Sequence, residues 1–399
     1  MFQRREPLAE PGRAGREREA VRGVRAVALV DGEHYAPVVR DALAAFPYEW
    51  VGAILVGGTE KLRPGADYGV PLVDGFGDAE VVVDLSDEPV LGPAERFRWI
   101  ARALAAGLPY AGADFRFEPP SFEPFGLPSL AVIGTGKRVG KTAVAVHAAR
   151  LLARDRSVVA VAMGRGGPAE PELVETPPTV EDLLALSRAG RHAASDHFEL
   201  AAFAGVPAIG CRRAGGGLAG AVFTSNVSEG AQLAALHSPD AVVFDGSAAA
   251  LPPVETSARL LVTNSADDAL SYLNLYRLLI SDAIVLMHAP AEDAARLRGV
   301  VDVPVLRCEL NLRPTGPTEG RVAVFTAREL ANRDELQLLL DGSDADTYVI
   351  ELKAAAIDVV AEHAAAHGKR VVLATNDVVS VEGDLDAIIL SLVPATVSA

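Results

Sequence analysis

The chain has 399 residues, half of them hydrophobic, and its 37 basic and 53 acidic residues give a formal net charge of -16. This acidic balance argues against a nucleic-acid partner, because such proteins normally present a basic face. No apolar run approaches the length of a membrane span. Two cysteines, Cys211 and Cys308, provide neither a disulfide framework nor a metal-ligand spacing. A cytoplasmic protein without a membrane partner is therefore expected.

Residues 1–24 are rich in Arg, Glu, Gly and Pro. They contain no apolar segment of the kind found in a secretory signal, so we predict a disordered leader. Residues 25–127 read as a small α/β domain that ends in a linker, residues 109–128, rich in Phe and Pro. We expect the second domain to begin at residue 128.

Polar residues follow the predicted strands of this N-terminal domain. Asp31 and His34 come after residues 27–30, and Asp84 follows residues 81–83. Open parallel sheets bind ligands at the carboxyl ends of their strands, so Asp31 and His34 are candidate substrate contacts. Capping of a helix or closure of a turn explains Asp31 or Asp84 alone equally well.

A glycine-rich turn, residues 134–142, separates a predicted buried strand, residues 130–133, from a predicted amphipathic helix, residues 143–153. Strand, glycine-rich turn, Gly-Lys-Thr and helix is the order of a P-loop. Backbone N–H groups of such a turn, together with the start of the helix, surround a phosphate. Lys141 is predicted to reach the β- and γ-phosphates of ATP, and Thr142 to bind Mg²⁺.

The first glycine of the turn departs from the common G-x-x-x-x-G-K-[ST] pattern. It is Gly134, one residue before the position at which this chain has Thr135. The form resembles the loop of dethiobiotin synthetase and its ATPase relatives. The alternative interpretation, an ordinary tight turn between a strand and a helix, ranks well below a nucleotide-binding loop. Gly-Lys-Thr, the preceding strand and the following helix all indicate a nucleotide-binding loop. The predicted nucleotide contacts within the turn are Gly134, Thr135, Gly136, Val139, Gly140, Lys141 and Thr142.

Two further loops combine arginine with glycine. Arg165 lies between glycines after the predicted strand of residues 157–163, and Arg212 and Arg213 precede a glycine run. Guanidinium groups beside bare backbone suit a phosphate or carboxylate ligand. A flexible loop with solvated arginines is the alternative, and for Arg212 and Arg213 spacing alone supports it nearly as well.

An acidic residue ends the apolar run of residues 241–244. This residue, Asp245, has the position of a Walker B carboxylate, which holds Mg²⁺ directly or through water. Strands often end in Asp, but downstream of a P-loop this one becomes the best metal candidate. Asn264 follows a later predicted strand, residues 260–263, at a point where related folds hold the nucleotide base.

Strand and helix patterns continue to alternate as far as residue 377. So many alternations predict a mostly parallel sheet covered by helices on both faces. The predicted fold class is α/β, with a small Rossmann-like N-terminal domain and a larger P-loop NTPase domain, residues 128–399.

Taken together, these motifs resemble one family, the cyclic 2,3-diphosphoglycerate synthetases. The resemblance extends over nearly the whole chain after the leader. The P-loop is common to many proteins, whereas the stretches Asp-Gly-Glu-His-Tyr and Met-Gly-Arg-Gly-Gly-Pro are far more particular. The resemblance rests on residues 29–35, 84–92, 134–142, 162–168 and 244–247.

The resemblance implies that the chain joins the two phosphates of 2,3-diphosphoglycerate into a ring and converts ATP to ADP and phosphate. The product serves as a compatible solute and phosphate store in some microbes. ATP and Mg²⁺ are the implied cofactors, 2,3-diphosphoglycerate is the implied substrate, and we expect a homodimer. Within this scheme, Lys141, Lys137 and Arg138 are assigned to ATP, with Mg²⁺ on Thr142 and Asp245. Arg165, Arg212 and Arg213 are assigned to the diphosphoglycerate.

Two other functions fit the same motifs. One is an ATP-dependent ligase or kinase of the dethiobiotin-synthetase type that acts on another small anion. The other is a dimeric P-loop switch ATPase that moves a partner protein. Many switch ATPases carry a lysine near the start of the loop, at the position that Gly136 occupies here, while Lys137 lies one residue later. This difference disfavours the switch.

Overall fold

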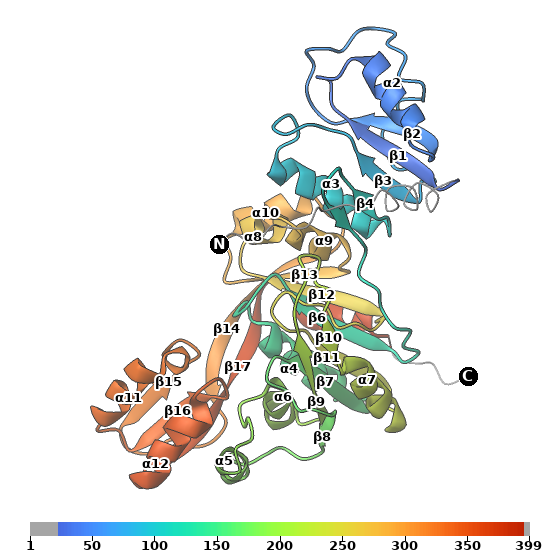
Figure 1. Ribbon diagram of the computed structural model, residues 1–399. Helices are drawn as coiled ribbons and strands as arrows, with labels where there is room; N and C mark the ends of the chain where they lie inside the picture. Colours follow the sequence, from blue (N-terminus) through green and yellow to red (C-terminus); the bar gives the residue numbers. More distant parts are fainter. Residues whose placement is uncertain (1–22, 395–399) are drawn as a thin grey trace, which may run out of the picture. The chain divides into compact units, whose positions relative to one another are not determined.

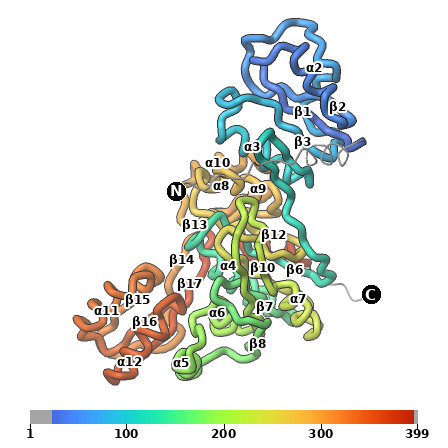
Figure 2. The backbone as a smooth tube through the Cα atoms, in the orientation of Figure 1, coloured from blue at the N-terminus to red at the C-terminus, as the bar shows by residue number. Residues whose placement is uncertain are grey.

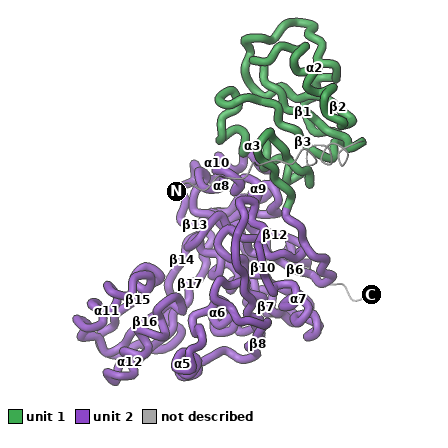
Figure 3. Tube along the Cα trace, in the orientation of Figure 1, with its two compact units in different colours: residues 1–119 green, residues 120–399 purple. Residues whose placement is uncertain are grey.

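The computed structural model describes residues 23–394. It divides into two compact units, one ending at Pro119 and the other beginning at Pro120 (Figure 3). The predicted leader lies outside the described residues except for its last two positions, 23 and 24. The predicted domain limits stay a prediction.

Unit 1 contains a five-stranded sheet in the order β2-β1-β3-β4-β5, in which all neighbours are parallel except β4 and β5. Helix α2 places Val39 and Leu43 against Ala28 and Val30 of β1, so its apolar face covers the sheet (Figure 1). The elements are β1 (Arg25–Val30), α2 (Ala36–Ala45), β2 (Glu49–Leu55), β3 (Val81–Asp84), α3 (Pro93–Ala105), β4 (Tyr110–Ala111) and β5 (Arg116–Phe117).

Unit 2 is built on a 12-stranded sheet in the order β10-β9-β7-β11-β6-β12-β13-β14-β17-β16-β15, with β8 paired to β9. Only the pairs β8–β9, β9–β10 and β14–β17 are antiparallel. Its strands are β6 (Ser129–Gly134), β7 (Val158–Gly164), β8 (Glu172–Val174), β9 (Ala208–Ala214), β10 (Thr224–Ser225), β11 (Ala241–Asp245), β12 (Ala258–Thr263), β13 (Ala283–Met287), β14 (Val305–Pro314), β15 (Val322–Phe325), β16 (Thr347–Glu351) and β17 (Arg370–Glu382).

The helices of unit 2 connect these strands, and the buried cluster they form with the sheet runs from Val144 of the P-loop helix to Tyr348 of β16. Both units are thus α/β with mostly parallel sheets, which confirms the predicted fold class. The helices are α4 (Lys141–Leu152), α5 (Val180–Arg188), α6 (Asp196–Ala204), α7 (Val227–Leu236), α8 (Ala266–Leu270), α9 (Asn274–Leu279), α10 (Ala291–Arg298), η1 (Glu329–Ala331), α11 (Arg333–Asp341), η2 (Ala356–Ala361), α12 (Glu362–Ala366) and α13 (Leu385–Leu392).

Strand β6 lies between β11 and β12, and all of its residues are buried. In this register Asp245 of β11 pairs with Val132, and Val262 of β12 pairs with Gly134. The carboxyl ends of the three strands therefore meet at one edge of the sheet. That edge is where parallel α/β sheets bind ligands.

Strands β14 and β17 form a long antiparallel ribbon, in which Pro314 pairs with Ala374. Strand β16 pairs in parallel with the first part of β17, so that Glu351 lies opposite Ala374. Strands β15 and β16 therefore extend beyond the carboxyl end of β14, together with α11 and α12 (Figure 2). Because they run opposite to the P-loop strands, their carboxyl ends point back toward the carboxyl ends of those strands.

Within residues 23–394, no helix combines the length and the apolar character that crossing a bilayer requires.

Candidate active site

The P-loop wraps around the side chain of its own lysine. The Lys141 ammonium donates a hydrogen bond of 2.6 Å to the carbonyl oxygen of Gly136, and Lys141 is buried. A Cβ atom at Gly134 would lie 2.7 Å from Cδ of Lys141, and Gly140 has a φ of +96°, so both positions require glycine. The glycines thus give the lysine room to lie inside the loop.

Thr135 shows why the first glycine can lie one residue early. Its N–H group donates to the carbonyl oxygen of Val262, and its hydroxyl lies 3.2 Å from the Thr263 hydroxyl. Thr135 thus continues the pairing of β6 with β12 as a buried polar residue. Val139 is also buried and belongs to the core. Their assignment to the nucleotide stays a prediction.

A cavity of about 460 Å³ opens beside the P-loop. Its lining residues come from the P-loop near the start of unit 2 and from strands near its C-terminal end. The loop of residues 164–167, which contains the predicted Arg165, lines one part of the cavity. The turn after β11, which begins at Gly246, lines another. The first turn of α6 and the carboxyl end of β16 complete the wall. The predicted residues that line the cavity are Lys137, Arg138, Gly140, Lys141, Thr142 and Arg165.

Three cations of this cavity have no counter-ion in the described chain. Within residues 23–394, the side chains of Lys137, Arg138 and Arg165 form no hydrogen bond and no ion pair. In a chain with a formal net charge of -16, most cations have carboxylates available. Unpaired cations around a P-loop therefore indicate a site for an anion.

The glycines beside Arg165 permit close packing of two loops. A Cβ atom at Gly167 would lie 2.1 Å from the carbonyl oxygen of Cys211, which the strand pairing of β7 and β9 brings alongside. Arg213 donates a hydrogen bond of 3.0 Å to the carbonyl oxygen of Ser247, next to the cavity. Burial and the nearby Arg165 charge lower the pKa of Arg213.

The other predicted residues of unit 2 do not line the cavity; these are Gly134, Thr135, Gly136, Val139, Asp245, Arg212, Arg213 and Asn264. Arg212 and Asn264 are exposed, and neither they nor Arg213 line the cavity. Arg213 is held at its border by Ser247, whereas no such contact fixes the Arg212 side chain among residues 23–394. The assignments of Arg212 and Arg213 to substrate, and of Asn264 to the base, stay predictions.

Asp245 is a buried carboxylate, and neither of its oxygens has a hydrogen-bond partner within the described chain. Burial raises its pKa, and the Asp196 charge adds to the effect while Lys141 opposes it. Orphaned buried oxygens are costly unless a ligand satisfies them. Mg²⁺ commonly uses one or two protein ligands and takes its other oxygens from phosphates and water, so Asp245 with Thr142 fits this ion.

The structure also brings in charged residues that the sequence patterns did not single out. Lys353 forms an ion pair with Glu199 and lies 3.8 Å from the Asp196 carboxylate. The Glu351 carboxylate accepts hydrogen bonds from the Ala327 N–H group and from the Asn376 amide. Among the strand patterns that continue to residue 377, residues 348–351 form one that ends in Glu351, with Lys353 two positions later, and this was the only signal that the sequence offered.

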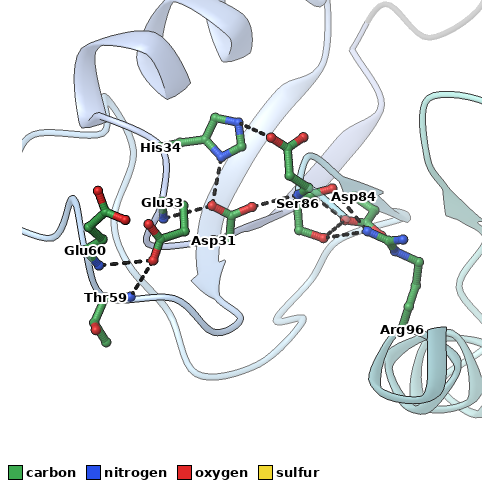
Figure 4. Close-up of polar contacts among 9 residues, drawn as sticks. Asp31, Glu33, His34, Thr59, Glu60, Asp84, Ser86 and Arg96 are labelled. Atoms are coloured by element: carbon green, nitrogen blue, oxygen red, sulfur yellow. Dashed lines mark hydrogen bonds and ion pairs between the residues drawn. The ribbon is translucent and has the colours of Figure 1, made fainter. Parts of the chain in front are cut away.

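In unit 1, the polar residues at the strand ends bind to one another (Figure 4). One oxygen of Asp31 accepts the N–H group of Glu33 at 2.9 Å and lies 2.8 Å from Nδ1 of His34. The other accepts the N–H group of Asp87 at 2.7 Å. Asp31 therefore links the loops that follow β1 and β3. This is the turn-closing role that the sequence offered as the alternative to a substrate contact. The assignment of Asp31 and His34 to substrate stays a prediction.

We expect Asp31→Asn to destabilise unit 1 by about 1–3 kcal/mol, because the N–H donor of one partly buried hydrogen bond loses its charged acceptor. Burial tends to raise the pKa of Asp31, but the hydrogen bonds from Asp87, His34 and Glu33 outweigh it and hold the pKa below its ordinary value. Because its pKa is lower in the folded protein, ionised Asp31 stabilises the fold above about pH 4. This stabilisation is lost as the pH falls through the pKa of Asp31 in the folded protein. The difference from wild type should therefore shrink on acidification.

The measurement is denaturant unfolding at pH 7 and pH 3.5, followed by tryptophan fluorescence. Both tryptophans, Trp50 and Trp99, lie in unit 1 and report on that unit. Asp78→Asn is the matched control, since Asp78 forms an exposed ion pair with Arg25 and such pairs contribute at most about 1 kcal/mol. Equal stability of Asp31→Asn and wild type at pH 7 would contradict the structural role.

Comparison with known proteins finds three family models that match this chain, each described as a domain of cyclic 2,3-diphosphoglycerate synthetase. The N-terminal domain model matches residues 25–118 and the P-loop domain model residues 129–303. The C-terminal domain model matches residues 319–377, which contain Lys353.

Proteins named cyclic 2,3-diphosphoglycerate synthetase are similar to the chain over nearly its full length. The protein from Rubrobacter xylanophilus is 44% identical, over 93% of this chain and 98% of the relative. The protein from Pyrococcus abyssi is 36% identical over 90% and 95%, and that from Thermococcus gammatolerans is 37% identical over 90% and 94%. The resemblance in the motifs is thus confirmed, and this chain belongs to the cyclic 2,3-diphosphoglycerate synthetase family.

Proposed function

We propose that this chain closes 2,3-diphosphoglycerate into its cyclic form in an ATP-dependent reaction that releases ADP and phosphate. The observation that carries the proposal is the set of unpaired cations, Lys137, Arg138 and Arg165, around a P-loop cavity in a member of this family. Two polyanions must approach each other in this reaction, and a cavity with free positive charge favours that approach.

The reaction is proposed to proceed in two displacements. In the first, an oxygen of one substrate phosphate attacks the γ-phosphorus of ATP, the bond to the β,γ-bridging oxygen breaks, and ADP leaves. In the second, an oxygen of the other substrate phosphate attacks the phosphorus that was activated, and inorganic phosphate leaves as the ring closes. Both steps join existing anions, so catalysis consists of alignment and charge neutralisation.

The chain's residues divide between the two ligands in this proposal. Lys141 and the backbone N–H groups of the P-loop bind the ATP phosphates, with Lys137 and Arg138 at the rim. Arg165 binds the diphosphoglycerate from the facing loop, with Arg213 beside it. Asp245 and Thr142 would hold Mg²⁺, which would supply positive charge beside the phosphate oxygens.

The test is a mixture of protein, ATP, Mg²⁺ and 2,3-diphosphoglycerate, followed by phosphorus NMR. We expect signals of a cyclic diphosphate, with one ADP and one phosphate formed for each ring. Omission of the diphosphoglycerate should stop ADP release. ADP release with another acceptor from a panel of small anions would indicate a different ligase or kinase, and slow ATP turnover without any acceptor would indicate a switch ATPase.

A further inference from the structure

Lys353 reaches the P-loop cavity from the C-terminal part of unit 2. It follows the carboxyl end of β16, which the β14–β17 ribbon turns back toward the P-loop strands. Its side chain lines the same cavity as Lys141 and Arg165. The residue after it, Ala354, also lines the cavity and has a φ of +35°, an uncommon conformation for a residue other than glycine. Such backbone strain concentrates at functional sites.

The use of lysine in this chain sets Lys353 apart. The chain contains 32 arginines but five lysines, and three of the five, Lys137, Lys141 and Lys353, line this single cavity. Lysine presents a compact charge on a flexible stem, which can follow a phosphoryl group as it moves. A lysine opposite the P-loop would therefore complete the positive surround of a phosphate that passes between two anions.

The partners of Lys353 hold it as a charged group inside the cavity. Glu199 pairs with it, and Asp196 lies 3.8 Å away, both on the first turn of α6. Burial works against its charge, but the Glu199 and Asp196 carboxylates outweigh burial and keep the pKa of Lys353 above its ordinary value. Burial in turn raises the pKa of Glu199 to about 7.

We propose that Lys353 is a catalytic residue, whose ammonium group contacts the phosphoryl group in transit between ATP and the substrate phosphate. Glu199 and Asp196 hold the ammonium group when ligand is absent. Lys353 stays protonated throughout and forms no covalent bond, so it contributes charge alone. This inference rests on the proposed function. The alternative is a tether, in which the ion pair with Glu199 only fixes the C-terminal segment to α6.

Lys353→Met alone and Lys353→Met combined with Glu199→Gln separate the loss of the ammonium group from the effect of an unpaired carboxylate at Glu199. We expect Lys353→Met to lower kcat for ADP release at least about 100-fold. Its Kd for a non-hydrolysable ATP analogue, measured by calorimetry, should stay within about threefold of wild type, because the P-loop is intact. The double variant removes the unpaired carboxylate as well, and we expect it to be as slow as Lys353→Met.

Two further measurements complete the experiment. Ethylammonium should partly restore turnover to Lys353→Ala, which a lost tether would not permit. Lys369→Met is the matched control, because Lys369 belongs to the same C-terminal segment, donates to the Ala345 carbonyl oxygen and does not line the cavity. It should retain wild-type kcat.

Recovery of wild-type kcat in the double variant, or an unchanged kcat in Lys353→Met, would overturn the catalytic role. A wild-type protein that forms no cyclic product would refute the proposed function instead. In that case the kcat values for ADP release with the true acceptor would still decide the role of Lys353.

Discussion

Replacement of Lys141 by methionine is expected to lower kcat at least about 1000-fold, which is the range observed when phosphoryl transfer loses a central cation. Lys141 is buried within the P-loop and is held there by the Gly136 carbonyl oxygen. Burial lowers its pKa, while the Asp245 and Asp196 charges oppose this effect. Phosphate oxygens of ATP would replace the Gly136 carbonyl oxygen as the partner of Lys141 and would favour its charged form further. The variant tests whether this charge is essential.

The measurement is ADP release at saturating ATP and 2,3-diphosphoglycerate, together with phosphorus NMR of the products. Methionine keeps the length and apolar stem of lysine, so the thermal midpoint of the unliganded variant should stay close to wild type. Lys141→Arg should be similarly slow, because the larger planar group does not fit inside the loop. ATP-dependent ring closure at more than a tenth of the wild-type rate in Lys141→Met would refute the role.

Asp245→Asn is expected to have the second largest effect, a loss of about 100- to 1000-fold in kcat at ordinary Mg²⁺ concentrations. An amide binds Mg²⁺ less well than a carboxylate, so part of the loss should reverse at high Mg²⁺. Calorimetric titration of Mg²⁺ into the protein with a bound ATP analogue should show the same weakening. Wild-type affinity for Mg²⁺ in this titration would refute the assignment.

Although Asp245→Asn should lower kcat, its stability relative to wild type should increase with pH. Burial raises the pKa of Asp245, so the folded protein holds this proton to a higher pH than the unfolded chain does. Between the unfolded value of about 3.9 and the raised folded value, the native state binds more protons. Stability of the unliganded wild type therefore falls as pH rises through this window.

An amide has no such titration, so the stability of Asp245→Asn relative to wild type should increase from pH 5 to pH 8. Thermal unfolding without ligand at several pH values measures this difference. A constant difference across that range would show that the Asp245 carboxylate titrates normally.

Much of the site could be predicted from the sequence, because a P-loop is a contiguous motif. Its glycines, lysine and threonine follow one another, and their roles depend on local backbone conformation. Arg165 could be predicted for the same reason, since it lies between glycines at the tip of a strand. The place of Asp245 at the end of a strand beside the P-loop strand could be predicted because an apolar strand that ends in an acid has a known position in P-loop sheets, whereas its role toward Mg²⁺ stays a prediction.

Asp31 shows the limit of this reasoning. Its position at a strand end suited both a ligand contact and the closure of a turn, and only the tertiary structure shows that the backbone N–H groups of Glu33 and Asp87 donate to its oxygens. Hydrogen bonds to residues 56 positions away cannot be read from local pattern. The exposed positions of Arg212 and Asn264 were hidden for the same reason.

The sequence by itself determined the α/β class, the P-loop and the family, because these depend on periodicity and on short motifs. Tertiary structure alone decided which strand ends share a cavity. Lys353 and Glu199 are 154 positions apart, and they meet because the antiparallel β14–β17 ribbon reverses the direction of the last strands. Strand direction and register arise from packing of the whole sheet, so no local pattern could place a C-terminal lysine opposite the P-loop.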